Sequence, residues 1–201
     1  MRSNGLNKFI TSKLIFIGIV TAWLSGQGTQ WEFDMAHSKI SFDVTHMVIS
    51  HVEGRFGSFT GSVEAGKDDF SDAKTTITID TATINTDNDR RDGHLRSPDF
   101  FDVEKYPEIT FVSTNVRKSG KNSYLLTGDL IMHGATKPVE LNVQHLGTIL
   151  DPRGNTRAGF KVKGTINRTD WGLTYNSIMD SGGFVISENI DINGNVELIR
   201  K

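Results

Sequence analysis

Apolar and polar residues alternate with a period of two through most of this chain. Between Lys39 and Thr45, the apolar residues Ile40, Phe42 and Val44 are separated by polar residues. The same alternation recurs in residues 76–80, 108–112, 126–132, 139–144, 160–163 and 190–193. Successive side chains of a β-strand point to opposite faces, so each segment predicts a strand with one apolar face and one polar face.

Short segments rich in Gly, Asn and Asp separate the predicted strands. Residues 119–122, 133–135 and 151–155 are examples, and their composition is typical of turns. The spacing predicts about eight strands in an antiparallel meander. A sheet with one apolar face forms either a sandwich or a barrel, and simple up-and-down connectivity favours the barrel. A barrel of about eight strands is filled by side chains or holds one small ligand.

One segment interrupts the alternation. Residues 86–103 are polar and contain Gly93 and Pro98, which predicts a loop rather than a strand. Within it, residues 89–95 are expected to form a short helix behind an Asp or Asn cap. A connection of this length is usually functional in a compact domain. The expected fold class is therefore an all-β barrel with one short helical loop segment.

The N-terminal residues are typical of a secretory signal. A basic stretch up to Lys13 precedes an apolar run over residues 14–24, and small residues follow at Ser25, Gly26 and Gly28. The apolar run is shorter than the roughly 20 residues that span a bilayer, so cleavage is favoured over a retained anchor. We expect residues 1–28 to be a signal peptide and residues 29–201 to be the mature domain.

Composition excludes several kinds of chemistry. The chain has no cysteine, which rules out disulfides, thiol catalysis and a lipid-anchoring cysteine. The formal net charge of −2 becomes more negative when the basic leader is removed, so we expect no nucleic-acid partner.

Four segments resemble the YceI-like, or polyisoprenoid-binding, family in the order in which that family has them. They are HSKISFDVTHMVISHVEGRFGSFTG (37–61), RRDGHLRSPDFFDVEKYPEITF (90–111), TGDLIMHGATKPVEL (127–141) and INRTDWGL (166–173). The resemblance implies a lipocalin-like antiparallel β-barrel whose lumen binds an isoprenoid or a similar lipid chain. It also implies a periplasmic location.

The expected ligand-binding residues are the apolar positions that face the lumen, together with an arginine and a tryptophan near the mouth of the barrel. They are Ile40, Phe42, Val44, Phe56, Ile77, Ile79, Ile109, Phe111, Leu126, Leu130, Met132, Val139, Leu141, Phe160, Val162, Arg168 and Trp171. The alternative for the apolar positions is a dry core without a ligand. For the mouth, Arg168 binds a ligand head group and Trp171 covers the entrance, or Arg168 pairs with Asp170 and Trp171 plugs the end.

The remaining polar residues favour a structural interpretation. Arg91 and Asp92 are expected to form a buried ion pair, with His94 donating to a backbone carbonyl, because no nucleophile motif accompanies them. The histidines at 37, 46, 51 and 133 lack the spacing of a zinc site. No catalytic residue, metal or cofactor is expected.

These observations favour a periplasmic binding or carrier protein for a long apolar ligand such as a polyisoprenoid, a quinone or a fatty amide. Two alternatives remain: a surface-acting stress-response module, which requires a filled lumen and an exposed apolar patch, and an enzyme acting on a lipid. The expected partners are the lipid-chain ligand and a transient membrane-protein partner, and the expected oligomeric state is a dimer.

Overall fold

The computed structural model describes residues 28–178 and 184–201, so the predicted leader lies outside the described residues up to position 27. The strands are β1 (Thr29–Phe33), β2 (Lys39–His46), β3 (Ser50–Phe56), β4 (Phe59–Ala65), β5 (Lys74–Asp80), β6 (Ile84–Asn85), β7 (Glu108–Gly120), β8 (Ser123–Met132), β9 (Ala135–Leu150), β10 (Thr156–Asn167) and β11 (Ile186–Arg200). The helices are α1 (Asp89–Arg96) and the 3₁₀ turns η1 (Thr81–Thr83) and η2 (Arg168–Trp171).

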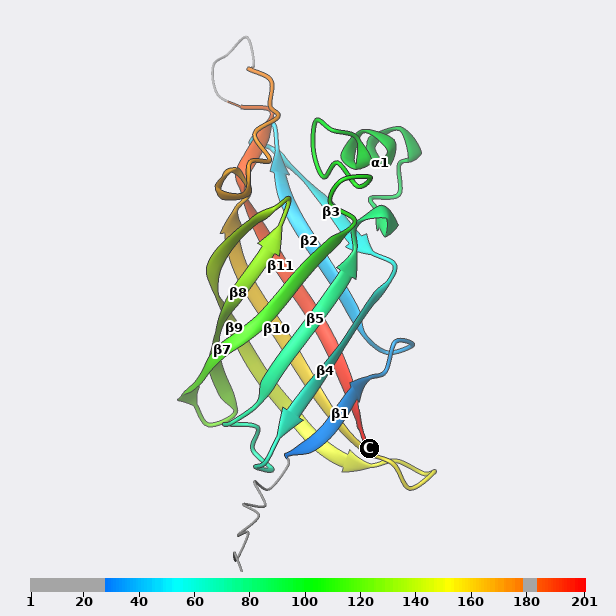
Figure 1. The fold of residues 1–201 in the computed structure, drawn as a ribbon, viewed down its shortest axis with the longest axis vertical. Helices are drawn as coiled ribbons and strands as arrows, with labels where there is room; N and C mark the ends of the chain where they lie inside the picture. The colour runs from blue at the N-terminus through cyan, green and yellow to red at the C-terminus, as the bar shows by residue number, and fades with distance from the viewer. Residues whose placement is uncertain (1–27, 179–183) are drawn as a thin grey trace, which may run out of the picture.

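The strands form one closed antiparallel barrel (Figure 1). β1 and β2 both pair with β11, while β4 pairs with β1 and β3 pairs with β2. The pairs β1/β2 and β3/β4 therefore each occupy one strand position, and with β5, β7, β8, β9, β10 and β11 they make a closed barrel of eight positions. Neighbouring positions follow the chain order, which confirms the lipocalin-like up-and-down barrel predicted from the sequence.

Tight turns and small residues allow this curvature. The loop between β8 and β9 has only two residues, His133 with φ 50° and Gly134 with φ 77°. Positive φ at both positions is the geometry of the hairpin turn that matches strand twist. Within the wall, Gly54 lies under the ring of Phe42, where a Cβ atom would be 2.2 Å from Phe42 Cζ. Glycine at position 54 thus leaves room for the outer end of the Phe42 ring against the barrel wall.

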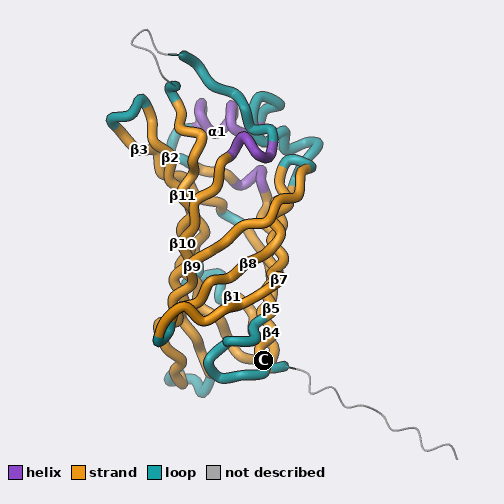
Figure 2. The backbone as a smooth tube through the Cα atoms, turned by 90° about the vertical axis from the view of Figure 1, so that its left-hand side faces the viewer, coloured by secondary structure: helices purple, strands orange, loops and turns teal. Residues whose placement is uncertain are grey.

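A helical segment covers the upper end of the barrel, where β3 pairs with the two-residue strand β6. Figures 1 and 2 show α1 at this end, beside β3. α1 begins after Asn88, whose side-chain oxygen accepts a hydrogen bond from the Arg91 amide at 3.0 Å. This confirms the predicted short helix and its Asn cap. Across residues 28–178 and 184–201, no helix has both the length and the apolarity needed to cross a membrane.

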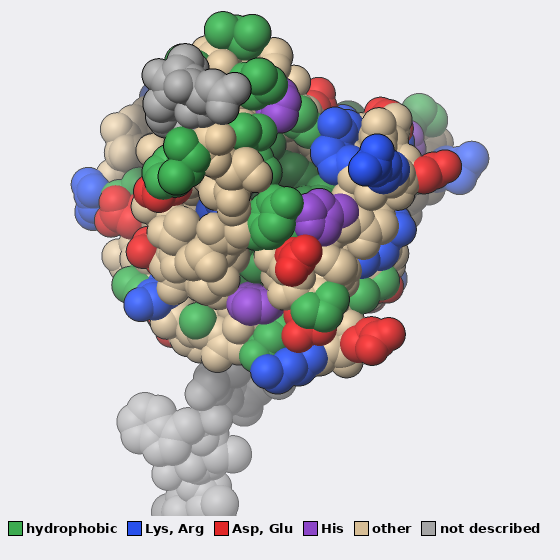
Figure 3. Space-filling model, turned by 90° about the horizontal axis from the view of Figure 1, so that it is seen from above, with side chains coloured by type: hydrophobic (Ala, Val, Ile, Leu, Met, Phe, Trp, Pro, Cys, Tyr) green, Lys and Arg blue, Asp and Glu red, His purple; other side chains and the backbone are tan. Residues whose placement is uncertain are grey.

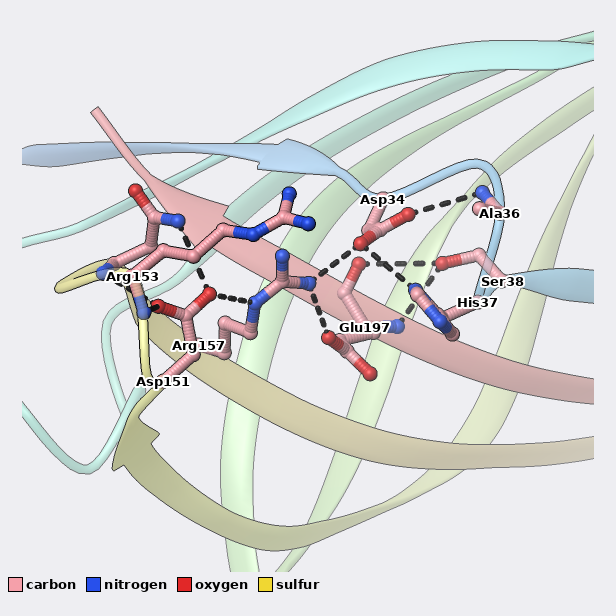
Figure 4. Close-up of polar contacts among 9 residues, drawn as sticks. Asp34, Ala36, His37, Ser38, Asp151, Arg153, Arg157 and Glu197 are labelled. Carbon is pink, nitrogen blue, oxygen red and sulfur yellow. Dashed lines mark hydrogen bonds and ion pairs between the residues drawn. The ribbon is translucent and has the colours of Figure 1, made fainter.

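An ion-pair cluster binds the strand ends together at the lower part of the barrel (Figure 4). The Arg157 guanidinium contacts Asp34 and Glu197 through Nη1 at 2.5 Å each, and Asp151 through Nε at 2.6 Å. These residues belong to the β1–β2 connection, β11 and the β9–β10 hairpin. One arginine on β10 therefore ties three separate segments.

Candidate functional site

The barrel encloses a cavity of about 780 Å³. This volume falls in the range of small-molecule binding sites, and its wall is mostly apolar, as such sites are. Sixteen of the expected ligand-binding residues line it: Ile40, Phe42, Val44, Phe56, Ile77, Ile79, Ile109, Phe111, Leu126, Leu130, Met132, Val139, Leu141, Phe160, Val162 and Arg168. Their inward orientation is thus a feature of the structure, whereas their contact with a ligand stays a prediction.

Trp171 is not part of the cavity wall. Its side chain is buried, it packs in the upper apolar cluster with Leu173, and its indole nitrogen donates to the Leu130 carbonyl at 3.0 Å. This buried position is closer to the alternative in which Trp171 plugs the end of the barrel than to the one in which it covers the entrance. The pairing of Arg168 with Asp170, which belongs to the same alternative, does not form. Asp170 is exposed, whereas Arg168 is buried.

Several cavity-lining residues were not among the expected ligand-binding set. Val143, Ile190 and Ile192 lie on the alternating segments, so their orientation follows from the same pattern. Phe70, Phe100 and Phe101 come from connections between strands, where no period of two assigns a face.

Phe70 lies at the lower end of the cavity in a left-handed backbone conformation, with φ 59°. Its ring centroid is 5.0 Å from that of Trp31 and 4.9 Å from that of Phe160. Phe70 and Phe160 line the cavity, whereas Trp31 packs in the same cluster without lining it. Phe70 and Trp31, both buried, therefore form an aromatic floor.

The upper end carries most of the polar cavity-lining residues: His46, Thr86, Asn88, Arg90, Arg91, His94, Arg168, Tyr175 and Ser177. Figure 3 looks down on this end and shows hydrophobic, basic and histidine side chains around a hollow. The cavity thus has an apolar floor and a polar upper end, which is the polarity expected for an amphipathic ligand.

The prediction of an ion pair between Arg91 and Asp92 is wrong, because both side chains bind Thr86 instead. Arg91 donates from Nε to Thr86 Oγ1 at 2.7 Å and from Nη2 to the Thr86 carbonyl at 2.8 Å. The buried Asp92 carboxylate accepts from the Thr86 amide at 2.9 Å and from its hydroxyl at 2.5 Å. The backbone and hydroxyl groups of Thr86 are closer partners than the two charges are to each other, so α1 is bound to the segment that precedes it.

His94 also differs from expectation. Its Nε2 atom pairs with Asp99 at 3.0 Å rather than donating to a backbone carbonyl. The ring packs edge-on against Phe100 and Tyr175, with centroids 5.0 and 4.7 Å away. This half-exposed His–Asp pair lies beside the mouth.

Arg168 contributes a buried cation to the upper wall. The residue is 4 % exposed; its Nε atom donates to the Ser187 carbonyl at 3.0 Å, and Nη1 donates to the Leu173 carbonyl. Burial lowers the pKa of Arg168, and the nearby Glu188 charge opposes that shift. An arginine still stays protonated at neutral pH, so the wall carries a positive charge there.

The histidines at 37, 46, 51 and 133 lie in different environments. His51 pairs with Asp43 at 2.6 Å, and His133 contacts the Trp171 carbonyl at 3.0 Å. His37 lies with Asp34 and Glu197 in a group whose ligand atoms could reach one metal ion. However, the Arg157 guanidinium already contacts both carboxylates, which disfavours a second cation.

Comparison with known proteins identifies the family. The model of the YceI-like domain family matches residues 31–198. A UPF0312 protein of Staphylococcus aureus strain MSSA476 is 36% identical over 170 residues, which cover 84% of this chain and 96% of the relative. The Campylobacter jejuni YceI crystal structure is similar with a TM-score of 0.68 and 31% identity, covering 78% of this chain and 90% of that one.

Two further solved structures share the fold at lower identity. Burkholderia cenocepacia BcnA has a TM-score of 0.72 and 23% identity, over 82% of this chain and 98% of that one. A polyisoprenoid-binding domain from Saccharophagus degradans has a TM-score of 0.62 and 18% identity, over 85% of this chain and 98% of that one.

Proposed function

Because the chain belongs to the YceI-like domain family, we propose that it binds one long apolar chain in the barrel lumen and carries it through the periplasm. The cavity of about 780 Å³ with an apolar wall is the observation that carries this proposal. The polyisoprenoid-binding domain of S. degradans has the same fold, which supports a polyisoprenoid as the ligand. A quinone and a fatty amide are further candidates, because each also ends in a long apolar chain.

The energetics of such binding are hydrophobic. Removing apolar surface from water contributes about 25 cal/mol per Å², so a buried chain of a few hundred Å² offsets the cost of association. This mechanism needs no covalent step, and we assign the protein no catalytic activity. The signal-like N-terminus supports export, which N-terminal sequencing of periplasmic protein tests directly: retention of Met1 on a membrane-bound form contradicts it.

The carrier function is tested by extracting protein purified from its native compartment with organic solvent and identifying the bound lipids by mass spectrometry. Delipidated protein is then titrated with a polyprenyl quinone. We expect one chain per barrel. Protein that carries no lipid and does not bind the quinone overturns the proposal.

A pair of matched variants separates lumen binding from surface binding. Val162→Trp places a large side chain into the cavity, whereas Val112→Trp adds the same side chain to an exposed position of β7. We expect Val162→Trp to lose most quinone binding and Val112→Trp to retain it, with both variants folded by circular dichroism. Equal binding by the two variants contradicts a site in the lumen.

A surface-acting module is the second candidate, because apolar side chains are exposed at the upper rim. Val48 and Ile49, in the β2–β3 turn, are 75 % and 87 % exposed. The Met47 amide in the same turn donates to the Val185 carbonyl at 2.8 Å. That candidate also requires a lumen filled by side chains, which the cavity volume argues against. If Val162→Trp, whose lumen is filled, kept the full biological activity of the unmodified protein, that result would favour the surface-acting module.

A further inference from the structure

Apolar side chains are exposed on two neighbouring segments at the upper end of the barrel. Ile178 and Phe184, which are 78 % and 50 % exposed, pair with each other through an antiparallel bridge. The β2–β3 turn lies beside them, because the Met47 amide binds the Val185 carbonyl. Figures 1 and 2 show this turn at the upper end. We call the exposed side chains of both segments the apolar rim: Met47, Val48, Ile49, Ile178 and Phe184.

The backbone of the β2–β3 turn does not favour the residues that it carries. The Ile49 amide donates to the His46 carbonyl at 3.3 Å, so Met47 and Val48 are the central residues of a four-residue turn. Their φ angles are 51° and 66°. Such turns prefer Asn and Gly, and a β-branched residue such as valine is disfavoured at positive φ. The chain thus keeps large apolar side chains at an exposed, unfavourable position, which indicates that these side chains have a role outside the fold.

The apolar rim is continuous with the wall of the cavity. Val44 and Val52 are paired across β2 and β3 below the turn, and both line the cavity. Val185, which follows Phe184, lines it as well. An apolar path therefore leads from the rim into the lumen.

We propose that the apolar rim docks the mouth of the barrel on the surface of a phospholipid bilayer, with Val48 and Ile49 inserted among the lipid chains. This inference rests on the proposed carrier function, because a long apolar chain resides in a bilayer rather than in water and must be taken up from one. Membrane binding of this kind scales with the apolar area inserted, so a small rim gives weak and reversible docking. A stable interface with a second copy needs about 20 to 30 residues on each side, which favours the bilayer as the partner.

The first test is flotation of purified, delipidated protein with phosphatidylcholine vesicles. We expect the unmodified protein to float with the vesicles, and the double variant Val48→Asn with Ile49→Ser to bind them at least about tenfold more weakly, because two inserted side chains are lost. The matched control is Ile149→Ser with Leu150→Asn, which removes equally exposed apolar side chains from the lower end of β9. This control should bind vesicles as the unmodified protein does.

Thermal unfolding separates docking from a structural role. Asparagine is favoured at positive φ, so the rim variant should melt at least as high as the unmodified protein while it binds vesicles more weakly. Ile49→Ser alone, outside the two central turn residues, is a second variant and should also weaken vesicle binding. Because the unmodified protein is tested first, its failure to float overturns docking whether or not the variants fold.

The second test compares two sources of a polyprenyl quinone. Delipidated protein is loaded from phosphatidylcholine vesicles or from dilute detergent. We expect the rim variant to load more slowly from vesicles and normally from detergent, because Val48 and Ile49 do not line the cavity.

The possible failures are distinguishable. If the unmodified protein takes up quinone from detergent but does not float with vesicles, the carrier function stands and the docking surface is wrong. The docking surface is also wrong if the lower-end control loses vesicle binding equally, or if the unmodified protein is a dimer that the rim variant converts to a monomer in analytical ultracentrifugation. If the unmodified protein takes up quinone from neither source, the carrier function is overturned, and docking as its loading step falls with it.

Discussion

Phe70 determines the depth of the lumen because its ring lies at the lower end of the cavity. The loop that carries it is fixed by Asp72, whose carboxylate accepts from the Gly66 and Lys67 amides at 3.1 Å each. The Tyr124 hydroxyl donates to the Asp69 carbonyl in the same loop. A ring held this firmly limits how far a ligand tail extends.

Phe70→Ala is therefore expected to accommodate a longer ligand. The lost ring has about the carbon content of one isoprene unit, so the bound polyprenyl chain should lengthen by about one unit at a cost of roughly 3 kcal/mol in stability. Mass spectrometry of extracted lipids measures the chain-length distribution. Phe59→Ala is the matched control, because Phe59 is equally buried but does not line the cavity; an unchanged distribution in Phe70→Ala contradicts the role of the floor.

Asp34 makes the stability of the lower end sensitive to acid. Hydrogen bonds from His37 and Arg157 lower the pKa of Asp34 from 3.8 to about 2. A carboxylate with a lowered pKa stabilises the folded state fully above its unfolded pKa, and this contribution is lost as the pH falls from about 4 to about 2.

Asp34→Asn is expected to lower the melting temperature at pH 5 and to reduce its further decline between pH 5 and pH 2. Thermal unfolding at several pH values measures both effects. Some acid dependence should remain, because hydrogen bonds from Arg157 and Asn155 also lower the pKa of Asp151. A pH profile parallel to that of the unmodified protein would show that Asp34 does not titrate as expected.

Among the elements, α1 carries one buried carboxylate that helps to hold it against the preceding segment. Asp92 accepts both the amide and the hydroxyl of Thr86, and it is 3 % exposed. Asp92→Ala removes the acceptor from two buried donors, which should cost roughly 1 to 3 kcal/mol. Denaturant unfolding measures this cost, with the exposed Asp89→Ala of the same helix as the control. Equal stability of the two variants contradicts the role of Asp92.

The strands were predictable because period-two alternation specifies which side chains share a face. In the folded barrel, almost all of the predicted apolar faces line the lumen. Loop contributions were not predictable in this way. Phe70 enters the cavity through a left-handed residue in a connection, and the partners of Arg91 and Asp92 depend on where Thr86 lies after folding. Such contacts depend on tertiary geometry, which alternation does not encode.

At the scale of the whole molecule, the closed ring of strands removes most of the exposed edges that lead open sheets to associate. Closure is made by β1 and β11, where Trp31 pairs with Arg200 and Phe33 with Leu198. Both ends of the described chain therefore take part in the barrel. The strands surround one lumen, and the family match covers residues 31–198.

The aromatic floor has a kinetic consequence. Because Phe70 and Trp31 are buried and packed together at the lower end, we expect a ligand to enter and leave through the upper end. A bound chain must then vacate the barrel before another is admitted, so exchange is single-file and limited by dissociation. In a stopped-flow chase of a fluorescent lipid, the release rate should not depend on competitor concentration. A rate that rises with competitor would instead reveal a second entrance through the barrel wall.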